Sequence, residues 1–261
     1  MDSGGFVCIR GLEIYPMKIL GIDIGGSAVK GAPVDIRTGK LLAERLRIET
    51  NKALTPLMMS RAVGKIARHF KWRGPIGIGF PGVVREGVTL TSANLHPRFI
   101  GCNTRALFAR ATRCRVALVN DADAAGLAEM SFGAGRRCRG SVLLLTLGTG
   151  VGSALFFRGK LFPNSELGHL QIKGRSAERY ISSAARKRRG RSWEEWGREL
   201  GGYLQSLERI LWPELIIIGG GVSAKSGKFF KYVKRRAPMV PARFHNEAGI
   251  VGAALWAAEQ K

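Results

Sequence analysis

The chain has 261 residues, 45% hydrophobic and 23% charged, which supports a packed core and argues against a disordered protein. Its 42 Lys and Arg against 19 Asp and Glu give a formal charge of +23, which indicates either a polyanionic partner (nucleic acid, anionic membrane or polyphosphate) or simply a basic, soluble surface. The four cysteines form no C-x-x-C pair and no apolar run is long enough for a membrane span, so a zinc knuckle, a dithiol redox motif and a membrane protein are disfavoured and a reducing cytoplasm is expected.

The first half of the chain predicts a mostly β unit with two helices. In chain order, the predicted elements are strands over 18–25, 29–35 and 41–49, a helix over 56–70, strands over 76–80 and 116–119, and a helix over 122–130. Thr55 is placed to cap the first helix, and Gly74-Pro75 to end it. Residues 1–16 precede the first clear strand, and we expect them to be an extension outside the fold.

The second half continues the mixed α/β pattern. Its predicted elements are strands over 142–147 and 152–157, a helix over 193–211, a strand over 215–221 and a last helix over 246–258. Ser192 and Glu195 have the spacing of a capping box at the start of the long helix. Two basic clusters stand out, and each is read either as a polyanion-binding surface or as a solvated face; the first has the spacing of one helix face. They consist of Lys225, Lys228, Lys231 and Arg235, and of Arg175, Arg179, Arg186, Lys187, Arg188, Arg189 and Arg191.

Two apolar strands end in similar glycine-rich turns. The first turn follows Asp23 in GIDIGGS (21–27), and the second is LGTGVGS (147–153). Glycines let backbone N–H groups approach an anion, and a carboxylate inside an apolar strand is costly unless it is paired or solvated at a site. The pair of turns therefore predicts a phosphate site, although each alone could be an ordinary hairpin. Neither turn is a G-x-G-x-x-G fingerprint or a P-loop.

Eight segments together resemble those of the ROK sugar kinases, and within them the polyphosphate glucokinases and polyphosphate/ATP glucomannokinases. They are GIDIGGSAVKG (21–31), FPG (80–82), SAN (92–94), NDADAAGLAE (120–129), LTLGTGVGSAL (145–155), ELGH (166–169), GGGVS (219–223) and NEAGIVGAA (246–254).

The resemblance implies an α/β fold of two ribonuclease-H-like lobes, as in actin-like ATPases and sugar kinases, with a cleft between them. A smaller N-terminal lobe is expected over 17–120 plus 245–261, and a larger C-terminal lobe over 121–244. The two glycine turns are expected to face each other across the cleft. The family also implies a cytoplasmic homodimer.

The resemblance also implies a role for each site residue. Asp121 would take the proton from the sugar 6-hydroxyl, and Asp23 would help to organise Mg²⁺. Asn94, Asn120, Glu166, His169 and Glu178 match sugar-binding positions. Phosphate-binding positions are Asp23, Gly25, Gly26, Ser27, Lys30, Gly148, Thr149 and Gly150, and the nucleoside-side loop has Gly220 and Gly221. From residue type alone, a helix cap is the favoured interpretation of Asn120-Asp121, and a loop histidine is that of His169.

The expected activity is phosphorylation of the 6-hydroxyl of glucose, or of mannose, by inorganic polyphosphate and also by ATP. A strictly ATP-dependent hexokinase or N-acetylhexosamine kinase is the alternative. A sugar-responsive DNA-binding regulator is less favoured, because the sixteen residues before Met17 are too few for a helix-turn-helix unit, and no specific nucleic acid is expected. The resemblance implies a zinc-binding cysteine cluster after the ELGH-like segment in many ROK proteins, but no cysteine follows Cys138 here, so no structural zinc is expected.

Overall fold

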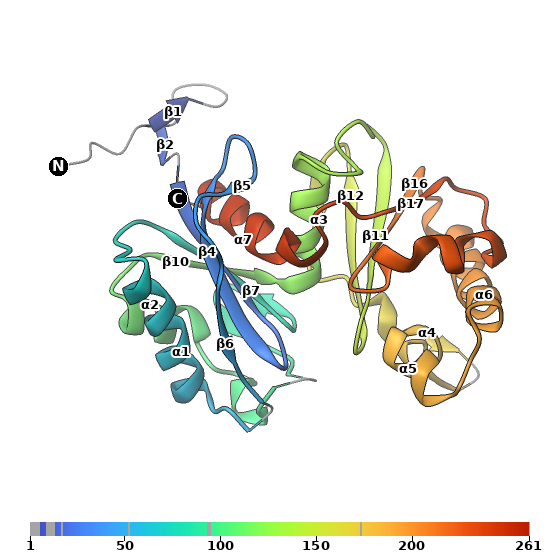
Figure 1. Cartoon of the computed structure of the whole chain (residues 1–261), viewed down its shortest axis with the longest axis horizontal. Coiled ribbons are helices and arrows are strands. Elements are labelled where there is room, and N and C mark those ends of the chain that lie inside the picture. The colour runs from blue at the N-terminus through green and yellow to red at the C-terminus, as the bar shows by residue number, and fades with distance from the viewer. Residues whose placement is uncertain are drawn as a thin grey trace. The chain divides into compact units, whose positions relative to one another are not determined.

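The computed structural model of the chain describes residues 6–8, 14–16, 18–51, 53–92, 95–172 and 174–260. The chain divides into two compact units, one formed by residues 1–128 and 247–261 and the other by residues 129–246 (Figure 1). The sequence places the boundary before Asp121, whereas in the structure the chain passes from the first unit to the second within helix α3 (Asp121–Ser131). None of the described helices is both long and apolar enough to cross a membrane.

The first unit is built on a six-stranded sheet. Its strand order is β10-β7-β3-β4-β5, and β6 also pairs with β4. Strand β3 runs antiparallel to β4 and parallel to β7, and β7 runs parallel to β10. The strands are β3 (Lys18–Ile24), β4 (Ala28–Asp35), β5 (Lys40–Leu41), β6 (Leu46–Glu49), β7 (Ile76–Phe80) and β10 (Val116–Asn120). A separate antiparallel pair, β1 (Phe6–Cys8) and β2 (Ile14–Pro16), lies within the predicted extension.

The predicted strand over 41–49 is wrong as a single element. It is split into β5 and β6, because Val34 of β4 pairs with Leu41 but Gly31 pairs with Leu46. Between these pairs stands Pro33, which has no N–H to donate to the ladder, while its carbonyl accepts from the N–H of Leu42. The partner chain therefore bulges opposite the proline.

Helices cover the sheet of the first unit. Helix α1 (Pro56–His69) begins as predicted, with the Thr55 hydroxyl accepting from the Met58 N–H, and it buries Met59, Val63 and Ile66. The sequence did not predict α2 (Thr104–Thr112), the 3-10 turn η1 (Pro97–Phe99) or the hairpin of β8 (Val84–Arg85) and β9 (Val88–Thr89).

The C-terminal helix α7 (Ala248–Glu259) lies directly on the sheet of the first unit. A Cβ atom at Gly77 of β7 would overlap the backbone of Ala253, and one at Gly21 of β3 would overlap the backbone of Ile250. These glycines are needed because the helix and strand backbones touch. The last helix thus returns to the sheet that contains Asp23.

The sheet of the second unit repeats the order of the first. Its five strands lie in the order β13-β12-β11-β16-β17, with β11 antiparallel to β12 and parallel to β16, and β16 parallel to β17. The strands are β11 (Ser141–Leu147), β12 (Val151–Phe157), β13 (Lys160–Phe162), β16 (Leu215–Gly219) and β17 (Met239–Pro241). In both units a central strand forms a hairpin on one side and a parallel ladder on the other, as a duplicated fold requires.

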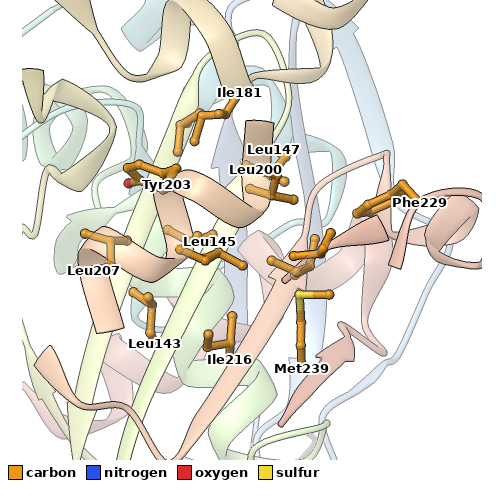
Figure 2. Packing of buried hydrophobic residues seen from close by; sticks show 14 of the residues in the cluster. Leu143, Leu145, Leu147, Ile181, Leu200, Tyr203, Leu207, Ile216, Phe229 and Met239 are labelled. Carbon is orange, nitrogen blue, oxygen red and sulfur yellow. The ribbon is translucent and has the colours of Figure 1, made fainter. Parts of the chain in front are cut away.

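The core of the second unit lies between its sheet and α6 (Trp193–Leu211). The predicted capping box is present, with reciprocal bonds between Ser192 and Glu195. Figure 2 shows the inward face of α6 packed on β11 and β16 through Leu200, Tyr203, Leu207, Leu143, Leu145 and Ile216. The remaining elements are η2 (Leu167–His169), β14 (Gln171–Ile172), β15 (Arg175–Ser176), α4 (Glu178–Ile181), α5 (Ser183–Arg188), η3 (Ser223–Lys228), η4 (Phe230–Tyr232) and η5 (His245–Glu247).

The basic cluster at 225–235 does not lie on one α-helix as the spacing predicted. It is carried by the 3-10 turns η3 and η4, and Lys225 has non-helical backbone angles (φ −111°, ψ 18°). Phe229 and Val233 are buried as expected, while Lys225, Lys228 and Lys231 are exposed. The apolar anchoring was predicted correctly and the helix was not.

Candidate active site

In the first unit, three of the predicted site residues lie at one edge of the sheet. Asp23 of β3 pairs with Gly79 of β7, and Gly79 pairs with Val119 of β10. Since β3, β7 and β10 are parallel, their carboxyl ends meet at the same edge, where Asn120 and Asp121 follow Val119. Carboxyl ends of parallel strands are the usual position of ligand sites in α/β sheets.

Asp121 is the first residue of α3 and is half-buried. One of its carboxylate oxygens accepts a hydrogen bond from the Ala122 N–H at 2.8 Å. A carboxylate at a helix N-terminus is stabilised in its ionised form by the helix dipole. An ionised, partly accessible carboxylate is what a general base requires.

Asn120 acts as the cap of α3. Its Oδ1 accepts from the Ala122 and Asp123 N–H groups at 2.8 and 3.1 Å, and its Nδ2 donates to the carbonyl of Gly82 at 3.2 Å. The side chain therefore fixes the start of α3 and ties it to the Phe80-Pro81-Gly82 turn. These bonds support the cap interpretation, and sugar binding by Asn120 stays a prediction.

The β3–β4 hairpin carries the first glycine turn. The Gly25 N–H bonds to the Ala28 carbonyl at 2.9 Å, and the exposed Ser27 lies at the tip. Lys30 Nζ lies 3.8 Å from a carboxylate oxygen of Asp23. Burial raises the pKa of Asp23, and the positive charge of Lys30 offsets part of that rise. Asp23 is thus a partly desolvated carboxylate beside a cation and a glycine turn.

In the second unit, the β11–β12 hairpin carries the other glycine turn, in the corresponding place of the duplicated sheet. The Gly148 N–H bonds to the Gly150 carbonyl at 3.0 Å, and Thr149 is exposed at the tip. The Gly148 carbonyl accepts from the N–H of Ala184 in α5 at 3.1 Å. A Cβ atom at Gly150 would come within 2.8 Å of a carboxylate oxygen of Glu178, so the end of the Glu178 side chain lies beside this turn.

Three predicted sugar-binding side chains also lie in the second unit. Glu166 Oε2 is 3.4 Å from His169 Nε2 across the turn η2. Burial raises the pKa of Glu166, and the electrostatic influence of the neighbouring Glu178 adds to the rise while that of His169 opposes it. The structure therefore brings Glu166, His169 and Glu178 together, next to the glycine turn at 148–150.

The remaining predicted site residues include the Gly220-Gly221 loop and Asn94. Gly220 has φ +78°, and a Cβ atom there would press on the backbone of Leu147 at the end of β11, so this loop adjoins the second glycine turn. Asn94 lies outside the described residues. Among the described residues there is no group of three or more His, Cys, Asp and Glu that could hold a metal ion by itself.

The chain matches the ROK family over residues 19–182. It belongs to the ROK family. It is 43% identical over 236 residues to the polyphosphate glucokinase of Mycobacterium tuberculosis, covering 90% of this chain and 89% of that one. The polyphosphate glucokinase of Mycobacterium leprae is 42% identical, with 90% of this chain and 73% of that one covered.

A solved structure confirms the fold expected for a ROK protein. The inorganic polyphosphate/ATP-glucomannokinase of Arthrobacter sp. strain KM superposes with a TM-score of 0.89 at 43% identity, covering 94% of this chain and 99% of that one. The predicted α/β fold of duplicated ribonuclease-H-like units and the predicted family are thus confirmed. The roles assigned to single residues stay predictions.

Sequence reasoning missed the side chains that support the ROK ELGH turn. The Ser153 hydroxyl accepts from the Leu167 N–H at 3.0 Å and lies 2.7 Å from the Ser165 carbonyl, while the Tyr203 hydroxyl donates to the Leu167 carbonyl at 3.0 Å. Tyr203 is almost fully buried, and burial raises its pKa. Its hydroxyl bonds to a residue 36 positions away in the chain, so this polar role could not be predicted from neighbouring residues.

Glu129, the last residue of the NDADAAGLAE segment, also has a role that the sequence did not reveal. Its side chain is fully buried and accepts three backbone hydrogen bonds, from Ala134, Arg243 and Phe244, at 2.7–2.8 Å. The partners at 243 and 244 are more than a hundred residues away, and only the fold identifies them.

Proposed function

We propose that this chain transfers the terminal phosphoryl group of inorganic polyphosphate to the 6-hydroxyl of glucose. The observations that carry the proposal are the 43% identity to a polyphosphate glucokinase over nine-tenths of the chain and the half-buried Asp121 carboxylate at the start of α3. We further propose that it acts in the cytoplasm as a homodimer and has no specific nucleic-acid partner.

Asp121 is assigned as the general base. Phosphoryl transfer needs little covalent help from the protein, because the transition state is stabilised mainly by positioning and charge neutralisation. A base within hydrogen-bond reach of the 6-hydroxyl removes its proton as the oxygen attacks phosphorus. The Asn120 cap at the start of α3 holds the Asp121 backbone in place.

The sugar is assigned to Glu166, His169 and Glu178, together with Asn120 and Asn94. A hexose presents adjacent hydroxyls, each of which donates and accepts, and carboxylate, amide and imidazole groups match that pattern. Support comes from the clustering of Glu166, His169 and Glu178 around η2, and from the desolvation that raises the pKa of Glu166. Partly desolvated acceptors bind hydroxyls more strongly than solvated ones.

The phosphates are assigned to the two glycine turns, with Gly25, Gly26, Ser27 and Lys30 in one and Gly148, Thr149 and Gly150 in the other. Asp23 fits a role in organising Mg²⁺, because this ion is commonly held by one or two carboxylates together with substrate phosphates. Bound Mg²⁺ would neutralise charge on the donor oxygens.

ATP is proposed as a second donor and mannose as a second acceptor. The support is the name of the 43%-identical Arthrobacter protein, a polyphosphate/ATP-glucomannokinase, and the Gly220-Gly221 loop beside the second glycine turn. An ATP-only hexokinase or N-acetylhexosamine kinase is the competing function.

The test supplies nucleotide-free enzyme with Mg²⁺, glucose and one donor at a time, and measures glucose 6-phosphate. We expect glucose 6-phosphate to form with polyphosphate as the donor, and also with ATP as the donor but at a different rate. Product from ATP alone would overturn the polyphosphate assignment, and turnover of N-acetylhexosamines in preference to glucose would overturn the acceptor. Sugar-dependent binding to a DNA sequence without turnover would favour a regulator.

A further inference from the structure

The second basic cluster encloses a pocket outside the residues assigned above. Residues 175–191 include seven Lys and Arg and a single acidic residue, Glu178. Four of the arginines and one tyrosine line a hollow of about 560 Å³, here named the arginine pocket. Its lining is Arg175, Arg179, Tyr180, Arg188 and Arg189.

Five of the cations in this cluster fall into two groups, and other protein side chains hold the guanidinium groups of the first. Arg189 makes two 2.7 Å hydrogen bonds to Glu199 and lies over the ring of Tyr180. Arg186 stacks on Trp193, with its guanidinium carbon 3.9 Å from the ring centroid. These contacts hold Arg189 in the wall of the pocket and hold Arg186 against Trp193, outside the lining.

The second group consists of Arg175, Arg179 and Arg188. All three are exposed, and no carboxylate in the described part of the chain lies within 4.0 Å of their side-chain nitrogens. Among the described residues, Arg188 donates a side-chain hydrogen bond to a backbone carbonyl, that of Arg179, at 3.3 Å. Three uncompensated guanidinium groups converging on one hollow repel one another, and an anion with several charges relieves that repulsion.

The pocket adjoins the second glycine turn through α4 and α5, all within the second unit. Arg179 lies in α4 next to Glu178, which contacts Gly150, and Arg188 ends α5, whose Ala184 donates to the Gly148 carbonyl. An extended anion held at the turn could therefore continue along these short helices to the pocket.

We propose that the arginine pocket binds the part of the polyphosphate chain that lies behind the phosphate being transferred. The inference rests on the proposed function and extends it to donor length. Guanidinium groups bind phosphate oxygens in pairs, and each unit of the chain brings a further negative charge. Because α4 and α5 separate the pocket from the glycine turn, we expect a long chain to gain more from it than ATP or tripolyphosphate does.

Polyphosphate fits the pocket better than single-stranded nucleic acid does. Sequence-tolerant binding of single strands uses aromatic faces on which bases stack. The aromatic residue of this pocket, Tyr180, already has Arg189 over its ring, with 5.1 Å between the guanidinium carbon and the ring centroid. The pocket therefore presents positive charge, while Arg189 covers a face of the Tyr180 ring on which a base would stack.

The experiment compares two triple variants of equal charge change. R175Q/R179Q/R188Q removes the unpaired cations of the pocket, and K225Q/K228Q/K231Q removes three exposed lysines elsewhere in the same unit. Binding of long-chain polyphosphate to each protein is measured by calorimetry over a range of salt concentrations. KM values for long-chain polyphosphate, tripolyphosphate and ATP are measured in parallel.

For the pocket variant we expect affinity for long-chain polyphosphate to fall about a hundredfold at 0.1 M salt, if all three contacts are made, and the log–log salt slope to become shallower by about 2. KM for the long chain should rise in step, whereas KM for ATP and tripolyphosphate should stay within about twofold. The lysine variant should behave like the wild type in all of these measurements.

Three results would overturn the inference. They are unchanged binding in the pocket variant, an equal loss in both triple variants, and equally tight binding of single-stranded DNA that is lost in the same way. If the wild type fails to use polyphosphate, the proposed function falls, yet the binding data still decide whether the pocket holds the polymer. If the wild type uses polyphosphate and the pocket variant binds it normally, only the pocket assignment falls.

Discussion

Replacing Glu129 with Gln should destabilise the second unit far more than its small change in shape suggests. One carboxylate oxygen accepts from the N–H groups of Arg243 and Phe244 at 2.7 and 2.8 Å, and the other from that of Ala134 at 2.8 Å. A glutamine keeps one oxygen but directs an NH₂ group at the remaining N–H. At least one bond is therefore lost and a buried donor is left facing another donor.

The magnitude follows from these three bonds. A hydrogen bond to a charged acceptor contributes about 1.5–3 kcal/mol, and a neutral one about half of that. Losing one such bond and weakening two others by half at a fully buried site gives a loss of about 3–6 kcal/mol. Glu194→Gln is the matched control, because its carboxylate is 44% exposed in a surface pair with Arg198 and its loss should cost less than about 1 kcal/mol.

Urea unfolding followed by tryptophan fluorescence and circular dichroism measures both variants. Tryptophans 193, 196 and 212 all lie in the second unit. We expect the midpoint of the Glu129→Gln transition to fall sharply and that of Glu194→Gln to stay near the wild type. A loss below about 1 kcal/mol in Glu129→Gln would show that the buried carboxylate does not hold the segment at 243–244.

Three further predictions test the packing and the site. On α6, a Cβ atom at Gly201 would come within 2.8 Å of the backbone nitrogen of Lys234, whereas a Cβ atom at its neighbour Gly202 would meet nothing within 4 Å. Gly201→Ala should therefore lower the unfolding midpoint, and Gly202→Ala should raise the free energy of unfolding by about 0.5–1 kcal/mol. Equal effects of the two substitutions would contradict the packing of α6. Tyr203→Phe removes the hydroxyl that donates to the Leu167 carbonyl at 3.0 Å, so the free energy of unfolding should fall by about 1 kcal/mol. Calorimetry should also show weaker glucose binding, and unchanged glucose affinity would show that this bond does not position the turn η2. Burial raises the pKa of Glu166, and its ionised form accepts hydrogen bonds from sugar hydroxyls, so glucose affinity should fall as the pH is lowered through that pKa. Glu166→Gln should remove this pH dependence, and the same pH profile in the variant and the wild type would contradict the assignment of Glu166 to the sugar.

The features that the sequence predicted correctly are those decided by neighbouring residues. The capping box at Ser192 and the Thr55 cap depend on contacts within one helical turn, and the glycine turns after β3 and β11 join strands that are adjacent in the chain. Such signals are complete within a few residues, so local rules suffice to read them.

The features that it missed depend on distant partners. Strand 41–49 is broken by Pro33 on the neighbouring strand, and the lysine cluster at 225–235 follows 3-10 turns that pack Phe229 into the core. Tyr203 looks like an ordinary core residue until its hydroxyl meets η2. In each case tertiary packing decides between local conformations that the sequence leaves nearly equal.

The measurement that tests the account most directly is the turnover of Asp121→Asn with glucose and polyphosphate, beside its affinity for glucose. A lost general base should lower kcat by about 10²–10⁴-fold, and calorimetry should find glucose affinity within about tenfold of the wild type. The loss should be the same with ATP as donor, since both donors use the same base. Turnover close to that of the wild type, with either donor, would contradict the assignment of Asp121 as the base.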